Sequence, residues 1–137
     1  MEQPPPGDAG YTAGMEHELR LLSEAMTEPL PGECLVCYVL RMLDFGCKGH
    51  RWLERYRDLR APRATALERR MHRLGGFCDC EILMNVFQLN PWLFEFDRHG
   101  DPILESMPCC PGVRGGSTQP CGMWVGRRRG RWPSMGY

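Results

Sequence analysis

Residues 34–43 read CLVCYVLRML and combine a pair of cysteines with the most apolar helical segment of the chain. Val36 and Val39 help to make this segment apolar nearly all round, which is typical of a buried helix. Cys34 and Cys37 form a C-x₂-C pair whose second sulfur lies in the first helical turn, where backbone N–H groups and the helix dipole favour thiolates. Such a pair is a familiar way of offering two ligands to zinc.

Two further pairs follow along the chain. Cys47-Lys-Gly-His50 is a C-x₂-H pair on a glycine turn, and Cys78-Asp-Cys80 is a C-x-C pair one residue after two glycines. The three pairs offer six ligands, whereas tetrahedral zinc takes four. We expect one structural zinc ion per chain, held by the set with the least strained spacing: Cys34, Cys37, Cys78 and Cys80. The pair Cys47 and His50 competes with this set, and a mixed set containing Cys47 stays open.

Each of these residues also has a plainer interpretation. Cysteine is among the most frequently buried residue types, and this applies most to Cys47. His50, beside Trp52, fits an ordinary surface or capping histidine equally well. The remaining cysteines lie in the C-terminal part of the chain, where we expect exposed free thiols or, as an alternative, a second and looser metal site: Cys109, Cys110 and Cys121.

Working outward from residues 34–43, the apolar spacing predicts helices on both sides. The expected segments are residues 15–27, 35–43, a third helix through Trp52 and Tyr56 that ends before Pro62, a fourth from Pro62 with its stop at Gly75–Gly76, and a short one over 81–87 that Asp79 caps. Residues 1–14 hold three prolines and three glycines, so we expect disorder there. The Gly, Pro and Arg content of residues 97–137 predicts a flexible tail.

The predicted fold is therefore mostly α: a small helical zinc-stabilised domain over residues 15–96, between a disordered N-terminus and a flexible C-terminal tail. A core of that size gains limited stability from apolar burial alone, which makes a metal staple plausible.

Composition narrows the class of protein further. The 137 residues carry no net charge and eight cysteines. No charged and apolar leader opens the chain, and its longest apolar run is far short of the roughly 20 residues that span a bilayer. Without an export signal, many cysteines indicate metal binding more often than disulfides. We expect a cytoplasmic protein with no membrane contact.

Charge is sorted along the chain although it cancels overall. Residues 1–34 carry seven acidic side chains against one arginine, and residues 48–73 carry nine basic side chains against three acidic ones. Pairing between these segments is the first interpretation. The second is contact with RNA or the ribosome, because arginine matches phosphate geometry. The candidate side chains for that contact are Arg51, Arg55, Arg69 and Arg73.

Catalytic interpretations fit poorly. The C-x-x-C of a thioredoxin-like enzyme lies inside a βαβ unit, whereas helices surround Cys34 and Cys37. Glu81 beside Cys80 suggests a zinc deaminase, but no H-x-E motif is present. We expect a non-catalytic, zinc-binding interaction or adaptor module with an unknown protein partner; the alternative is a zinc- or redox-responsive regulator.

The stretch LGGFCDCEILMNV (residues 74–86) resembles the signature of an uncharacterised bacterial family, found in actinobacteria and firmicutes, with a GG[FY]CDCE[VI]LxNV block. Residues 47–52 resemble the cysteine-containing turn that precedes this block in the family. The resemblance covers residues 34–86, implies no established activity, and places Cys47 among the possible ligands.

Overall fold

The computed structural model describes residues 6–106 and 108–127. About half of the chain is helical, so the mostly-α prediction is confirmed only in part. The helices are α1 (Pro6–Met26), α2 (Leu35–Met42), α3 (Arg51–Arg60), α4 (Leu67–Arg73) and α5 (Asp79–Glu81), and α5 continues as one π-helical turn over Ile82–Val86. Short 3₁₀ turns cover Leu43–Phe45, Pro91–Leu93 and Leu104–Ser106. Two strands, β1 (Phe87–Leu89) and β2 (Trp124–Gly126), complete the described elements.

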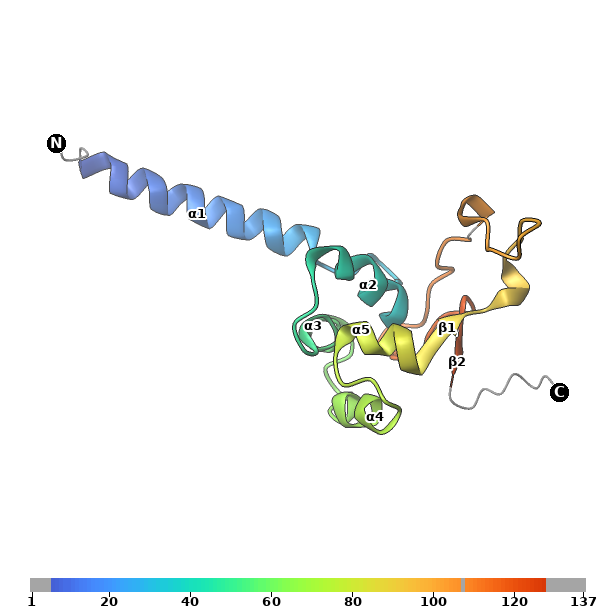
Figure 1. Ribbon diagram of the computed structural model, residues 1–137. Coiled ribbons are helices and arrows are strands. Elements are labelled where there is room, and N and C mark those ends of the chain that lie inside the picture. Colours follow the sequence, from blue (N-terminus) through green and yellow to red (C-terminus); the bar gives the residue numbers. More distant parts are fainter. Residues whose placement is uncertain (1–5, 107, 128–137) are drawn as a thin grey trace.

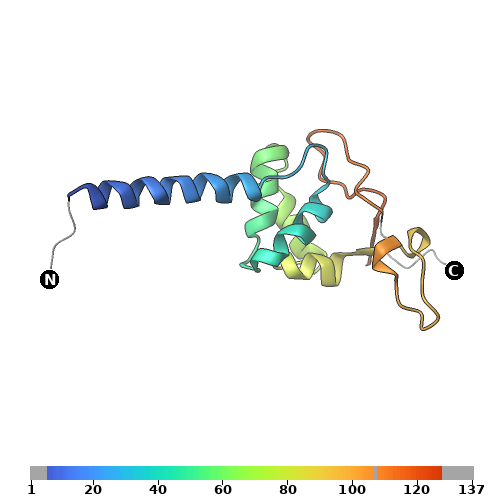
Figure 2. The same cartoon turned by 90° about the horizontal axis from the view of Figure 1, so that it is seen from above.

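Helix α1 extends away from the rest of the molecule as a single arm (Figures 1 and 2). All side chains from residue 13 to residue 26 are exposed. The helix begins at Pro6, a residue well suited to a first turn, so residues 6–14 are helical where the sequence predicts disorder over 1–14. Glycine lowers helix propensity without forbidding helix, and a helix nucleated over the apolar repeat extends at little further cost. Residues 1–5 lie outside the described part.

The helical core lies where α2, α3 and the α5 segment meet. Tyr38, Trp52 and Tyr56 are its largest members, and all three are at most 2% exposed. The Tyr38 ring meets the Trp52 ring edge-on, with 6.4 Å between the centroids. Both tyrosine hydroxyls donate to backbone oxygens, Tyr38 to Thr27 at 2.6 Å and Tyr56 to Glu33 at 2.9 Å, so the aromatic core carries no unpaired hydroxyl.

The two glycines after α4 end that helix as the sequence predicts. Gly75 has a φ of 97°, and the N–H of Gly76 donates to the carbonyl of Met71 at 2.8 Å. A Cβ on Gly76 would lie 2.9 Å from Val86 Cγ2, so glycine also permits the close approach of the next segment. The fourth helix is shorter than expected, because turns occupy the chain from Pro62 to its start at Leu67.

The C-terminal part of the chain returns to the core. Strand β2 pairs antiparallel with β1, with Phe87 opposite Gly126 and Leu89 opposite Trp124. Met123 and Trp124 are buried. The sequence predicts a flexible tail over 97–137, whereas residues 108–127 return to the core, where β2 pairs with β1 and Met123 and Trp124 join a local apolar cluster. Residues 128–137 lie outside the described part.

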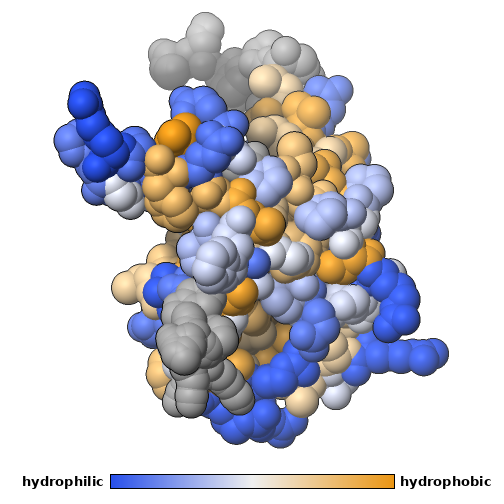
Figure 3. Space-filling view, turned by 90° about the vertical axis from the view of Figure 1, so that its right-hand side faces the viewer, coloured by the Kyte–Doolittle hydropathy of each residue, from blue (hydrophilic) through white to orange (hydrophobic). Residues whose placement is uncertain are grey.

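The surface on the β1–β2 side shows hydrophobic patches interspersed with hydrophilic side chains (Figure 3). Trp92 is 80% exposed, whereas Phe94, two residues later, is buried. Within residues 6–106 and 108–127, no helix combines the length and the apolar character needed to cross a bilayer.

Candidate metal centre

The first cysteine pair is held by the start of α2. Cys34 is the N-cap residue, with extended backbone angles (φ −79°, ψ 163°), and its Sγ accepts a hydrogen bond from the N–H of Cys37 at 3.3 Å. This arrangement satisfies one of the free N–H groups of the first helical turn and orients both sulfurs to the same side. Cys34 is fully buried and Cys37 is half-buried.

The second cysteine pair comes from the C-terminal segment. The chain crosses the turn before α2 at Gly112, where the N–H of Val113 donates to the carbonyl of Gly32 at 2.8 Å. A Cβ on Gly112 would lie 3.4 Å from that same carbonyl oxygen, so a small residue suits the crossing. The crossing brings Cys110 to the N-terminus of α2, and the approach of β2 brings Cys121 to the other side of the pair.

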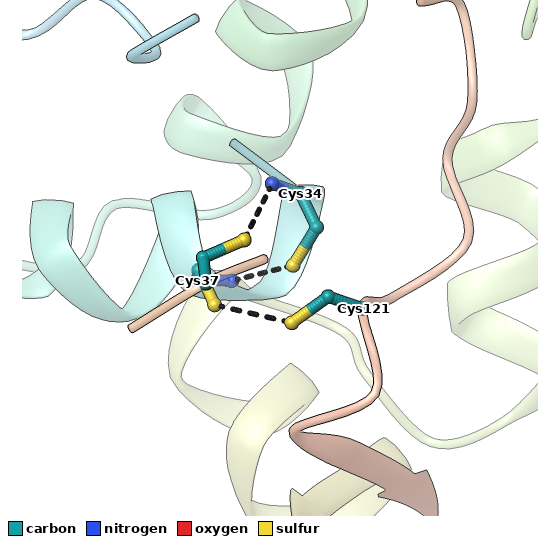
Figure 4. A group of neighbouring side chains, drawn as sticks. Cys34, Cys37 and Cys121 are labelled. Atoms are coloured by element: carbon teal, nitrogen blue, oxygen red, sulfur yellow. Dashed lines mark hydrogen bonds between the residues drawn. The ribbon is translucent and has the colours of Figure 1, made fainter. Parts of the chain in front are cut away.

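Four sulfur atoms meet as a result. The Sγ atoms of Cys34, Cys37, Cys110 and Cys121 all lie within 4.8 Å of one another. The Cys37 and Cys121 sulfurs point toward each other at 3.7 Å (Figure 4). Four thiolates about 2.3 Å from a tetrahedral zinc ion stand about 3.8 Å apart, so this spacing suits a shared ion. It is far longer than a disulfide bond, and all described cysteines are free.

Apolar side chains and hydrogen-bond donors surround these sulfurs. The indole N–H of Trp124 donates to Cys37 Sγ at 3.2 Å, and the N–H of Cys34 donates to Cys110 Sγ at 3.4 Å. Val36 and Met123 are buried in the same cluster. Donors of this kind stabilise thiolates and orient metal ligands, while the apolar shell limits access of water.

Hydrogen bonding and burial separate the protonation states of these thiols. Hydrogen bonding with Cys37 lowers the pKa of Cys34 to about 5, against the opposing effect of burial. The same interaction, together with burial, raises the pKa of Cys37. Burial raises the pKa of Cys121 to about 12. At neutral pH the metal-free group thus holds the Cys34 thiolate beside two protonated thiols, and these would lose their protons to a metal ion.

A second sulfur group lies near the start of α3, where Asp79 of the C-x-C turn contacts Trp52 and Leu53. The Sγ atoms of Cys47, Cys78 and Cys80 are within 4.8 Å of one another, and the N–H of Cys80 donates to Cys47 Sγ at 3.4 Å. All three residues are half-buried. Burial is the main cause that raises the pKa of Cys78.

The structure therefore divides the predicted ligand set. Cys34 and Cys37 join the C-terminal cysteines, whereas Cys78 and Cys80 join Cys47. The sequence predicts one site that combines Cys34 and Cys37 with Cys78 and Cys80. The structure does not bring these two pairs together. The physical reason is that Asp79 attaches the C-x-C turn to the start of α3, through hydrogen bonds from the N–H groups of Trp52 and Leu53.

His50 belongs to neither sulfur group. Its Nε2 lies 2.8 Å from the carbonyl oxygen of Gly76, and its Nδ1 lies 3.6 Å from Glu68 Oε2. The side chain is buried, and both of its ring nitrogens have partners within the protein. Both the ligand and the surface or capping interpretations differ from this environment: the ring is buried, makes no capping hydrogen bond at the start of α3, and contacts Gly76 and Glu68.

Sequence reasoning missed Cys110 and Cys121 as partners of the C-x₂-C pair. Two local signals were present. Each follows a proline within two residues, and Cys121 precedes the apolar MWV triplet over 123–125, which reads as a short strand. Cys109 is exposed, as expected for a free thiol.

Some of the arginines predicted to contact RNA have intramolecular roles. Arg55 donates through Nε to the carbonyl of Thr27 and through Nη2 to that of Glu24, both at 3.0 Å, so it binds the C-terminal end of α1. The guanidinium of Arg51 lies over the ring of Trp52, 4.2 Å from its centroid. Arg69 and Arg73 are exposed on α4.

Residues 35–85 match a family described as a protein of unknown function (DUF2695). The match lies within the segment for which the sequence suggested an uncharacterised family, and it confirms that likeness at this level. No curated protein and no solved structure matches the chain. The matched segment includes Cys47, Cys78 and Cys80, whereas Cys110 and Cys121 lie beyond it.

Proposed function

We propose that the chain is a non-catalytic interaction module whose fold is completed by one structural zinc ion, bound by Cys34, Cys37, Cys110 and Cys121. The observation that carries this proposal is the convergence of four sulfurs from three separate segments, with all pairs within 4.8 Å. Free cysteines are typical of a reducing compartment, so we place the chain in the cytoplasm.

Zinc fits the donor set better than other common ions. Calcium and magnesium take oxygen ligands, whereas four thiolates in a compact group are typical of zinc or iron–sulfur sites. Four protein ligands fill a tetrahedral ion and leave no position for substrate or water, which distinguishes a structural site from a catalytic one. The N–H donors on the sulfurs of Cys37 and Cys110 support the same role.

The energetic need for the ion follows from how the C-terminal segment is attached. Strand β2 is three residues long, and the segment before it has few buried side chains. Backbone ordering costs about 1–2 kcal/mol per residue, which such a short strand offsets poorly. Structural zinc contributes on the order of 10–16 kcal/mol in small sites. The ion would therefore hold residues 108–127 against α2.

Helix α1 is the proposed interaction element. Met15, Leu19, Leu22 and Met26 follow the alternating four- and three-residue spacing of a coiled-coil seam. Their side chains are 44–60% exposed and have no cover from the described parts of the chain. An apolar stripe along a projecting helix is suited to pack against a helix of a partner protein.

RNA or the ribosome is a second candidate partner, supported by the exposed side chains of Arg51, Arg69 and Arg73. Such binding would weaken steeply as salt rises, because each neutralised phosphate releases counterions. Replacing Arg69 and Arg73 by glutamate should abolish it. No RNA association at about 50 mM salt, where phosphate contacts are strong, would contradict this candidate.

The test of the zinc centre is elemental analysis of the full chain purified under reducing conditions, with two adjacent variants compared. Cys110→Ser should lose one zinc ion per chain, because serine is a poor ligand for zinc. Cys109→Ser is the matched control: it changes the neighbouring, exposed thiol and should keep the wild-type zinc content. Equal zinc content in the two variants would refute the four-cysteine centre.

A further inference from the structure

We infer that Cys47, Cys78 and Cys80 form a second metal site, which binds a zinc ion through three thiolates and leaves its fourth position to an exchangeable external ligand. The inference goes beyond the proposed function and does not depend on it, since the two sulfur groups share no residue.

Hydrogen bonds outside the sulfur group fix the position of the C-x-C turn. The carboxylate of Asp79, between the two cysteines of the C-x-C turn, is fully buried and accepts the N–H groups of Trp52 at 2.8 Å and Leu53 at 3.2 Å. In the other direction, the N–H of Asp79 donates to the carbonyl of Gly49 at 2.8 Å. Asp79 therefore joins the C-x-C turn both to the start of α3 and to the turn that carries Cys47.

A second link holds the same two segments together. The ring of His50 contacts the carbonyl of Gly76, so the residues on either side of the sulfur group are attached to each other at two places. Gly46 and Gly49 have positive φ angles of 107° and 56°, which bring Cys47 back toward the C-x-C turn. Three sulfurs fixed in this way lose little conformational freedom when they bind an ion.

Three ligands leave the coordination of zinc incomplete. Within the described residues, no fourth cysteine, histidine or carboxylate joins this group. The nearest candidates along the chain are engaged elsewhere: Glu81 Oε1 accepts the N–H of Phe77 at 2.9 Å, and His50 faces Gly76 and Glu68. Zinc held by three protein ligands takes water or another external donor in the fourth position. The half-buried state of the sulfurs allows such a donor to reach the ion.

This architecture predicts different behaviour at the two centres. The four-cysteine group is closed, lies in an apolar cluster and includes the fully buried Cys34. The three-cysteine group is more accessible, has one thiolate fewer, and should exchange its ion faster and bind it more weakly. Reversible binding at this site would make the domain responsive to available zinc, whereas the four-cysteine centre would hold its ion throughout.

The experiment is a titration of the metal-free full chain with Co²⁺ under a non-thiol reductant, followed by its visible and thiolate charge-transfer absorption. Wild type should bind two equivalents, and Cys47→Ser and Cys80→Ser should each bind one. Adding 2-mercaptoethanol should change the wild-type spectrum, because the external thiolate enters the open position. It should leave the spectrum of Cys80→Ser unchanged.

The outcomes separate this site from the four-cysteine centre. If wild type binds only one equivalent of Co²⁺, and its spectrum changes in Cys110→Ser but not in Cys47→Ser or Cys80→Ser, the second site is overturned. The proposed function then stands. If the single equivalent is lost in Cys47→Ser and Cys80→Ser but kept in Cys110→Ser, the four-cysteine centre is overturned and the second site stands. Two equivalents with no response to 2-mercaptoethanol would overturn the open fourth position. If Cys80→Ser fails to fold, Cys47→Ser, in a surface turn, supplies the same comparison.

Discussion

The backbone N–H of Cys34 donates to the sulfur of Cys110, 76 residues further along the chain. This contact joins the N-cap of α2 to the C-terminal segment within the sulfur group itself. Packing of the C-terminal segment and completion of the group are therefore the same structural event. Removal of a metal ion from the group should act first on that segment.

We predict that a strong zinc chelator detaches residues 108–127 from α2. The ion joins residues 108–127 to α2 through its bonds to four sulfurs, and without those bonds the three-residue strand β2 offsets the ordering cost of the segment poorly. The buried indole of Trp124, 7% exposed, should become solvated and shift its fluorescence to longer wavelength. Trp124→Phe is the control and should remove this change. An unaltered Trp124 signal in chain proven metal-free would contradict the prediction.

We predict that zinc binding at the four-cysteine centre releases at least two protons at neutral pH. The pKa of Cys37 is raised and that of Cys121 is about 12, so both are protonated before zinc binds. Because the metal competes with protons, affinity should rise with pH and fall as pH falls. The dependence should steepen below about pH 5, where the Cys34 thiolate also takes up a proton.

Proton release is measured by calorimetric titration in buffers of different ionisation enthalpy. The Cys47→Ser, Cys80→Ser double variant restricts the signal to one centre. Release of fewer than two protons per zinc ion at pH 7 would show that these thiols are not all ligands.

Several parts of the fold could be predicted from the sequence because they depend on local chemistry. The helix after Cys34 and the stop at Gly75 follow from apolar spacing and from the backbone freedom of glycine. Asp79 was expected to cap its own short helix. It instead binds the N–H groups at the start of α3, a long-range contact that no local pattern reveals.

The ligand groups could not be predicted for the same reason. Sequence spacing shows which sulfurs form pairs and does not show which pairs meet. Asp79 turns Cys78 and Cys80 toward Cys47 and away from the C-x₂-C pair. Cys110 and Cys121 lie in a segment rich in glycine and proline whose order comes from strand pairing and sulfur contacts, so composition alone predicted flexibility there.

We predict that Asp79→Asn destabilises the domain. Each carboxylate oxygen of Asp79 accepts one buried backbone N–H, from Trp52 or from Leu53. Burial raises the pKa of Asp79, and these two hydrogen bonds oppose the rise. Asparagine keeps one acceptor and presents an NH₂ group to the other buried N–H. An unsatisfied buried donor costs about 1–3 kcal/mol.

Urea denaturation measures this change in the free energy of unfolding. Asp58→Asn, an exposed acid on α3, is the matched control and should change it by less than about 0.5 kcal/mol. Equal stability of the two variants would show that Asp79 does not organise the start of α3.

We predict that substitutions along α1 leave the domain stable and affect only its interactions. Leu19 and Leu22 are 60% and 58% exposed, so replacing both by alanine creates no cavity and removes no buried apolar area. Alanine is also a good helix former, and the helix should persist. The free energy of unfolding measured in urea should change by less than about 0.5 kcal/mol, the range expected of surface changes. Leu53→Ala, at a fully buried position of α3, is the comparison and should cost about 2–5 kcal/mol.

The same double variant then tests what the stripe binds. If α1 packs against a helix of another protein, partners crosslinked to wild type in cells should be lost from Leu19→Ala, Leu22→Ala and kept by Glu16→Ala, a change outside the stripe. If α1 pairs with a second copy of the chain, sedimentation should show a wild-type dimer that dissociates in the double variant. A large loss of stability in the double variant would mean that α1 packs on its own domain in solution, and the projecting arm would not be the interaction element.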